Sequence, residues 1–157
     1  LKAWPEENFA HIVDHLAEIH GLPSVLVGDE ADADRCAEVR RLARAPALNL
    51  GGQTSLVEMV SLARAARLFV GNDSGLMHLA AACALPTVAL FGPTDPLRYG
   101  PFGVARRVVQ QPCRCWPSLL DRCPHSDAPE ARCMRDLPLE AVRKAVDELL
   151  EFRGQFT

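Results

Sequence analysis

The sequence predicts an α/β protein: a Rossmann-like three-layer domain built on a parallel sheet. Short apolar runs alternate with amphipathic helical segments through most of the 157 residues. The runs are continuously apolar, which is typical of strands buried on both faces of a parallel sheet. Right-handed crossovers between such strands produce a layered domain. Polar turns follow three of the runs, as they do where such strands lead into helices.

The helices are predicted from apolar spacing and from their start and stop signals. Pro5, followed by two acids, opens the first helix, and Gly21 ends it. Ser55 and Glu58 have the spacing of a capping box, so another helix is expected to begin there. The remaining helices are expected in residues 33–44, 75–84 and 138–152.

The strands are expected where apolar runs stand between these helices. They cover residues 24–28, 47–50, 67–70 and 87–91, with a short last strand at 108–109. Ligands bind at the carboxyl ends of the strands in such sheets. Polar turns occupy these ends at residues 28–30, 72–75 and 92–95. The binding site is therefore expected at this edge of the sheet.

Composition and charge argue against two classes of function. A net charge of -3 and 6% aromatic residues do not suit a nucleic-acid surface. No apolar run reaches the roughly 18 residues that a membrane-spanning helix needs, so no spanning segment is expected. Because the chain begins with Leu1 and not with Met, we expect it to belong to a longer protein.

The turn Asn-Asp-Ser-Gly at residues 72–75 stands where a strand ends and a helix begins. Backbone N–H groups and the helix dipole favour phosphate at such a terminus. Gly75 permits close approach, Ser74 offers a hydroxyl, and His78 lies one turn further along. Asp73 would repel phosphate but suits sugar hydroxyls. The turn therefore indicates a ligand with phosphate and polyol parts, such as a nucleotide sugar.

Each of these residues also has a structural interpretation, which the turn alone leaves open. Asp73 or Ser74 could simply cap the helix. Gly75 could serve only close packing of the helix on a strand, and His78 could be a structural histidine.

The segment NDSGLMHLAAACALPTVALFGPTDP closely resembles the donor-side signature of glycosyltransferase family 9, the lipopolysaccharide heptosyltransferases. Four more segments resemble the family in the same order: LKAWPEENFAHIVDHLA, VLVGDEADADR, NLGGQTSLVEMVSLARAARLFVGNDSG and CRCWPSLLDRCPHSDAPEARCMRDLPLEAV. The resemblance implies the GT-B architecture of two facing Rossmann-like domains. Residues 1–157 would be the C-terminal, donor-binding domain, and the N-terminal acceptor domain with the catalytic base would be absent from this chain.

The resemblance implies inverting transfer of heptose from ADP-heptose to the lipopolysaccharide inner core. Such transfer takes place in the cytoplasm, at the inner face of the inner membrane. The chain alone would bind the donor without turnover. Two alternatives stay open: a GT-B domain for another donor, as in UDP-sugar transferases and related epimerases, or a non-catalytic remnant of the fold.

Carried over by position, the resemblance assigns Ser74 and Gly75 to the diphosphate and Asp73 to the heptose hydroxyls. His78 would line the same site. Lys2 matches the family's lysine ahead of Trp-Pro and would approach the diphosphate, where a cation stabilises the charge that develops on the leaving group.

Two further positions complete the implied donor site. Glu30 matches the acid that meets the ribose, although neighbouring aspartates, of which Asp29 is one, leave that register open. Thr94 and Asp95 would close the site or form only a Pro-bounded turn.

No metal or other cofactor is required by this chemistry. Asp32 and Asp34 match a metal-binding pair in letters, but their place at a predicted helix start indicates charge placement. A cluster of cysteines, Cys113, Cys115, Cys123 and Cys133, with His125 among them, is a candidate for a structural zinc site. Unpaired thiols and disulfides are the alternatives. Cys36 and Cys83 are expected to be buried thiols in helices.

Overall fold

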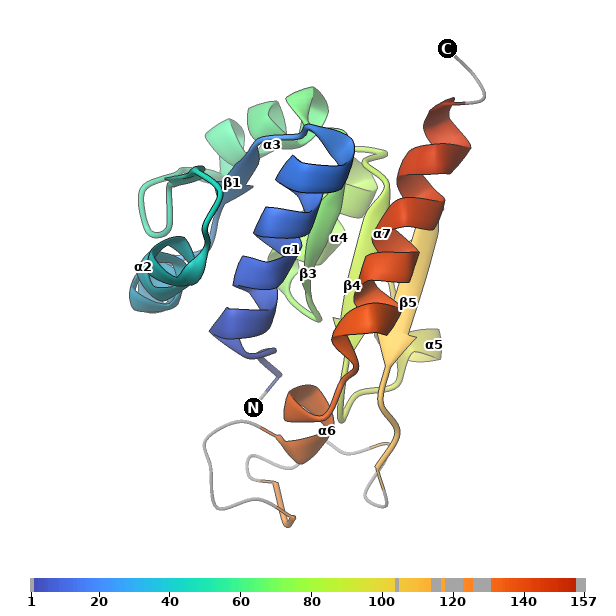
Figure 1. Cartoon of the computed structure of the whole chain (residues 1–157). Coiled ribbons are helices and arrows are strands. Elements are labelled where there is room, and N and C mark those ends of the chain that lie inside the picture. Colours follow the sequence, from blue (N-terminus) through green and yellow to red (C-terminus); the bar gives the residue numbers. More distant parts are fainter. Residues whose placement is uncertain (1, 104, 114–116, 118–122, 126–130, 155–157) are drawn as a thin grey trace. The chain divides into compact units, whose positions relative to one another are not determined.

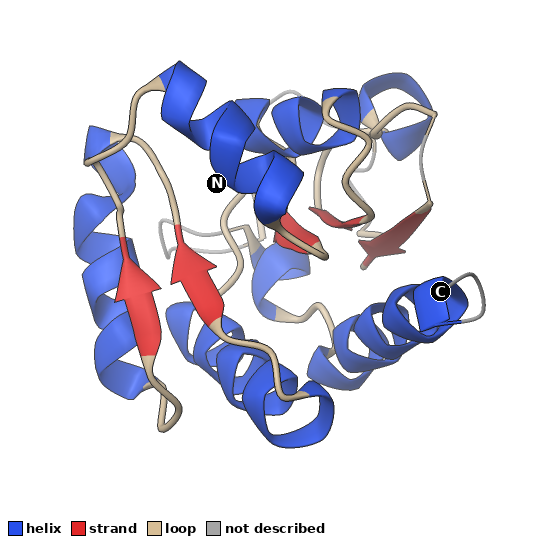
Figure 2. Cartoon of the chain, turned by 90° about the horizontal axis from the view of Figure 1, so that it is seen from above, coloured by secondary structure: helices blue, strands red, loops and turns tan. Residues whose placement is uncertain are grey.

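The computed structural model describes residues 2–103, 105–113, 117, 123–125 and 131–154 (Figure 1). The chain forms two compact units. One consists of Pro5–Met59, and the other of Leu1–Trp4 together with Val60–Thr157. Parallel strands flanked by helices make up each unit, as the sequence predicts (Figure 2).

The unit Pro5–Met59 is a two-stranded α/β layer. Its elements are α1 (Glu6–His20), β1 (Ser24–Leu26), the 3-10 helix η1 (Glu30–Asp32), α2 (Ala33–Leu42), β2 (Ala47–Asn49) and the start of α3 (Leu56–Ala65). β1 and β2 are parallel, with Ser24 opposite Ala47. Buried residues of α1 and of the α2 segment, among them Val13 and Val39, pack together with Leu26 into the core of this unit.

Local signals act here as the sequence predicts. Gly21 ends α1 with a left-handed φ of 63°, a conformation that glycine adopts without strain. The Glu58 carboxylate accepts hydrogen bonds from the Ser55 N–H at 2.8 Å and from the Ser55 hydroxyl at 2.7 Å, at the start of α3. The capping box is therefore confirmed. In the first turns of that helix Leu56 is 70% exposed and Met59 is buried.

A buried carboxylate ties α1 to the segment that follows α2. Asp14 accepts hydrogen bonds from the backbone N–H groups of Arg44 and Ala45, both at 2.8 Å. The Arg44 guanidinium adds a third at 2.9 Å. Burial raises the pKa of Asp14, but the hydrogen bonds from Ala45 and Arg44 outweigh it and hold the pKa below its ordinary value of 3.8.

The larger unit is organised around three parallel strands. Its elements are β3 (Phe69–Asn72), α4 (Gly75–Ala82), β4 (Thr87–Phe91), α5 (Pro96–Tyr99), β5 (Arg106–Gln110), α6 (Arg132–Arg135) and α7 (Leu139–Gly154). The strand order is β3-β4-β5, with every pair parallel. The central strand β4 is buried along its whole length.

Helices cover both faces of this central strand. Ala89 and Phe91 pack on Met77 of α4, on one face. Val88 and Leu90 alternate with them and therefore point to the other face, where α7 lies along β4 and β5 (Figure 1). The carboxyl ends of β3 and β4 consequently lie side by side at one edge, and the turns after them can meet.

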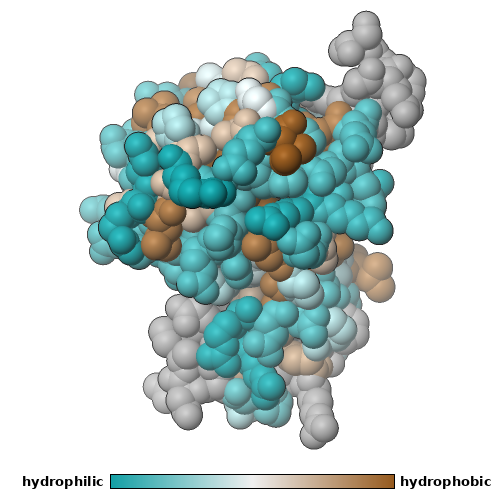
Figure 3. Space-filling view, viewed as in Figure 1, coloured by the Kyte–Doolittle hydropathy of each residue, from teal (hydrophilic) through white to brown (hydrophobic). Residues whose placement is uncertain are grey.

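The structure also departs from the expected elements. β3 ends two residues later than predicted, so Asn72 belongs to the strand. The helices α5 and α6 were not predicted, because four residues carry too little periodicity. None of the helices in the described part of the chain is long and apolar enough to cross a membrane. The surface seen in Figure 3 is largely hydrophilic, with hydrophobic residues in small separate groups.

We expect Asp14→Ala to lower the free energy of unfolding by about 2 kcal/mol at neutral pH, because two backbone N–H groups lose their acceptor. The pKa of Asp14 is lower in the folded chain than in the unfolded chain. Its contribution is therefore complete well above pH 3.8 and is lost as the pH falls through the lower, folded pKa. Denaturant unfolding at several pH values measures this. Glu38→Ala, which breaks the exposed pair with Arg41, is the control and should cause little change.

Candidate functional site

The carboxylate of Asp73 joins three parts of the larger unit. Asp73 follows β3, and its Oδ2 accepts a hydrogen bond from Lys2 Nζ at 2.6 Å. The same oxygen accepts a second bond from Thr94 Oγ1 at 2.7 Å. The Asp73 side chain is only 7% exposed, whereas that of Lys2 is 47% exposed. Three residues that the sequence assigned to one site are thus in direct contact.

Trp4 explains how the start of the chain reaches Asp73. Its side chain is completely buried, and its indole N–H donates to the carbonyl of Leu137 at 3.2 Å. Its backbone N–H donates to Asn72 Oδ1 at 3.1 Å. Trp4 is therefore held beside the end of β3, two residues from Lys2. The spacing Lys-x-Trp therefore places the ammonium of Lys2 next to the carboxylate of Asp73.

A residue of β5 holds the backbone around Thr94. Thr94 is 2% exposed. The side-chain amide of Gln110 donates to the carbonyls of Thr94 at 3.2 Å and of Gly92 at 3.4 Å. Gln110 stands opposite Phe91 in the parallel register, so its side chain reaches the loop after β4. Nothing in the sequence pattern marks Gln110, because a single amide at a strand end carries no motif. Asn72 belongs to the Asn-Asp-Ser-Gly turn, but its bond to the Trp4 backbone was not predicted.

The first turn of α4 leaves its polar groups available. Ser74 occupies the N-cap position with extended backbone, but its side chain makes no capping hydrogen bond. The first helical bond runs from the His78 N–H to the Ser74 carbonyl at 3.4 Å. The N–H groups of the three residues between them therefore have no partner within the helix. Ser74, Gly75 and His78 are all exposed.

The structural interpretations of this turn are now resolved for two residues. Asp73 does not cap α4, because its carboxylate is bonded to Lys2 and Thr94. Gly75 is not required for packing, since a Cβ built there meets no atom within 4 Å. The turn therefore contains a serine and a glycine that the fold itself does not need.

Two neighbouring residues of the loop after β4 have different roles. Thr94 joins Asp73, whereas the Asp95 carboxylate accepts a hydrogen bond from the Leu97 N–H at 2.9 Å and caps α5. The interpretation as a Pro-bounded turn thus fits Asp95. Pro96 occupies the first position of that helix, where its missing N–H costs nothing.

Glu30 belongs to the other unit and is described apart from the group around Asp73. It is the first residue of η1 and is exposed. Asp29 is the cap of η1, with Oδ1 accepting from the N–H groups of Ala31 at 2.9 Å and Asp32 at 3.2 Å. Asp34 lies in the first turn of α2, as expected of helix charge placement.

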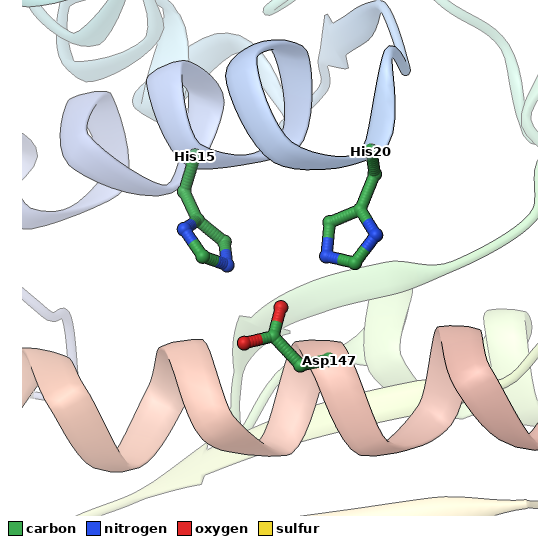
Figure 4. Close-up of side chains that lie close together, drawn as sticks. All are labelled: His15, His20 and Asp147. Atoms are coloured by element: carbon green, nitrogen blue, oxygen red, sulfur yellow. The ribbon is translucent and has the colours of Figure 1, made fainter.

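Two histidines of α1, His15 and His20, were not singled out by the sequence. Their rings face one another edge to face, with centroids 5.6 Å apart and an interplanar angle of 73° (Figure 4). The side chains project from the same helix. This contact is ordinary ring packing within one unit.

None of the described cysteines forms a disulfide. Cys36 is buried, as expected, and burial raises the pKa of its thiol. Cys83 is only partly buried. Burial, reinforced by the neighbouring Cys113 thiol, raises the pKa of Cys133 to about 12. Cys115 lies outside the described residues.

Comparison with known proteins gives a consistent family. The family model of glycosyltransferase family 9 (heptosyltransferase) matches residues 1–128. Lipopolysaccharide heptosyltransferase 2 of Escherichia coli is 37% identical over 113 residues, which cover 69% of this chain and 32% of that protein. Lipopolysaccharide heptosyltransferase 1 of Pseudomonas aeruginosa is 32% identical over 143 residues, covering 88% of this chain and 39% of that protein.

Solved structures agree with the sequence matches. The E. coli ADP-heptose lps heptosyltransferase II superposes with a TM-score of 0.81 at 28% identity, covering 98% of this chain and 43% of that chain. The E. coli heptosyltransferase WaaC with ADP superposes with a TM-score of 0.68 at 27% identity, covering 94% of this chain and 40% of that chain. The chain thus spans less than half the length of these proteins. The fold class is confirmed, and the chain belongs to glycosyltransferase family 9, the heptosyltransferase family.

Proposed function

We propose that this chain binds an ADP-sugar donor at the first turn of α4. In the complete protein it would be the donor half of an inverting GT-B enzyme that transfers heptose from ADP-heptose to the lipopolysaccharide inner core. The observation that carries the proposal is the Lys2–Asp73–Thr94 group beside a serine and a glycine that the fold does not use. The solved relative with ADP supports the choice of base.

The diphosphate belongs at the N-terminus of α4. Unused N–H groups, the helix dipole and the Ser74 hydroxyl offer hydrogen bonds to anionic oxygens. The negative charge of Asp73 would oppose a phosphate, but the ion pair with Lys2 at 2.6 Å offsets that charge. An ammonium has three donors, and Lys2 is half-exposed, so it can bind phosphate while it keeps Asp73.

The heptose and the ribose of the donor would bind the carboxylates of Asp73 and Glu30. Both bonds to Asp73 use Oδ2, and among the described residues none reaches Oδ1. We assign Oδ1 to a heptose hydroxyl and the exposed carboxylate of Glu30 to the ribose. Asp29 is less suited to the ribose, because its carboxylate already caps η1. His78, exposed one turn into α4, would line the same site.

Stabilisation of the departing ADP is the chemical role that these residues support. Negative charge grows on the diphosphate as the glycosidic bond breaks, and Lys2 and the α4 dipole stabilise that charge. The attacking acceptor and the catalytic base would come from an N-terminal domain at the cytoplasmic face of the inner membrane. No metal ion is needed for this direct displacement.

Calorimetric titration of the chain with ADP, ADP-heptose and UDP tests the proposal. We expect ADP to bind and UDP to bind much less, and ADP-heptose to bind more tightly than ADP. Asp73→Ala should remove the advantage of ADP-heptose, because the hydroxyl acceptor is lost. Preference for UDP would indicate another donor. If neither this chain nor the longer protein binds any of these ligands, the proposal is wrong and the fold is a non-catalytic remnant.

Gly75→Ala separates function from fold. A Cβ at Gly75 meets nothing within 4 Å, and alanine is a better helix former, so thermal stability should be unchanged or slightly higher. Binding of ADP should weaken at least about tenfold, because the methyl group occupies the path of the phosphate. Gly92→Ala is the contrasting variant. Its Cβ would lie 2.6 Å from Met134 Sδ, so it should lose stability. Unimpaired ADP binding by Gly75→Ala would contradict the assignment.

The two lysines of the chain give a matched pair. Lys2→Ala should weaken ADP binding by about tenfold, the value of a charge-assisted hydrogen bond of about 1.5 kcal/mol. Its loss should also make binding less sensitive to added salt. Lys144→Ala changes the net charge by the same amount on the exposed side of α7 and should leave the affinity unchanged. Equal losses in both variants would show that only net charge matters.

A further inference from the structure

We propose that Cys113, Cys123, His125 and Cys133 form a structural zinc site in the larger unit, separate from the donor site. These four side chains line one cavity of about 500 Å³. They come from three described stretches: the segment after β5, residues 123–125, and α6. Three thiolates and one imidazole are a common tetrahedral ligand set for structural zinc.

Two of the thiols, those of Cys113 and Cys133, already contact one another without being oxidised. Cys133 is 3% exposed, and its thiol shares a hydrogen bond with the Cys113 thiol and lies close to Cys123. The side chains of Cys113 and Cys123 are partly exposed, and His125 is exposed. One ligand is therefore fixed in the core, and the other three lie at the wall of the cavity.

Hydrogen-bond donors in the cavity suit a zinc–thiolate centre. Zinc bound by three thiolates and a neutral imidazole carries a net charge of about -1. Arg132 lines the same cavity, and its guanidinium is held by Asp136 at 3.1 Å between Nε and Oδ2. Asp136 lines the cavity as well, so the pair adds no net charge, but the remaining N–H groups of Arg132 can donate to a metal-bound thiolate, as outer-sphere partners do in metal sites.

Metal binding requires the cavity to contract. Within the described ranges, these ligand atoms do not form a group in which every pair lies within 4.8 Å. Zinc–sulfur bonds of about 2.3 Å would draw the chain after β5 and residues 123–125 onto α6. The expected gain is a fixed position of Cys113 and of residues 123–125 against α6.

The proposed centre is linked to the loop that carries Thr94. A Cβ at Gly92 would lie 3.0 Å from Cys133 Sγ, so the buried thiol packs directly on that backbone. Gln110 donates to the carbonyls of Gly92 and Thr94, and Cys113 follows three residues later. Zinc would therefore stabilise the loop that carries Thr94 through Cys133 and Gly92, and it would not contact the donor.

Metal analysis of the protein purified under reducing conditions, without chelator, tests the site. We expect about one zinc per chain, and a lower thermal midpoint after chelation that added zinc restores. Substitution with cobalt(II) should produce thiolate charge-transfer absorption and the intense visible bands of tetrahedral coordination. Cys123→Ser and His125→Ala should each weaken zinc binding at least about tenfold. Cys83→Ser, outside the cluster, should retain the metal.

Three results would overturn the assignment. Titration of all six cysteines as free thiols in protein without metal would show unligated cysteines. Loss of thiols when reductant is removed, again without metal, would show a disulfide. Zinc retained by His125→Ala but lost by Cys115→Ser would replace the imidazole by a fourth thiolate. Cys123→Ser and His125→Ala change side chains that are not buried, and circular dichroism of both verifies that the fold is intact.

Discussion

The larger unit depends on the buried carboxylate of Asp73. A carboxylate that is 7% exposed is costly unless it is paired and hydrogen-bonded. Lys2 supplies the charge and Thr94 the hydroxyl, and both must come from distant parts of the chain. Trp4 anchors the segment that carries Lys2, and Gln110 anchors the loop that carries Thr94. One electrostatic requirement thus ties the start of the chain to the ends of β3 and β4.

The first turn of α4 differs from its surroundings because stability does not explain it. A serine at an N-cap normally bonds the helix, and a conformationally unrestricted glycine costs helix stability relative to alanine. Here the Ser74 side chain makes no cap bond and Gly75 has open space around it. Residues that break a local rule without a structural gain indicate a binding site. The thiols around Cys133, which packs on Gly92 in the loop after β4, are a second feature that stability does not explain.

Local patterns were sufficient wherever neighbours in sequence decide the structure. The start of α1 after Pro5, its end at Gly21 and the Ser55–Glu58 box depend on hydrogen bonds and backbone preferences within a few residues. The parallel pairing followed from continuous apolar strands. The four-residue helices α5 and α6 were missed because they carry too little periodicity.

The sequence by itself determined the fold class and the family, because motifs and apolar periods are local. It also pointed to six residues near the ends of β3 and β4: Lys2, Asp73, Ser74, Gly75, His78 and Thr94. Only the tertiary structure decided what those residues do to one another. It showed that Asp73 binds Lys2 and Thr94 instead of capping α4, and that Asp95 is a cap. It also revealed Gln110, whose role exists only because β5 pairs beside β4. Contacts between segments tens of residues apart depend on packing, and no local pattern encodes them.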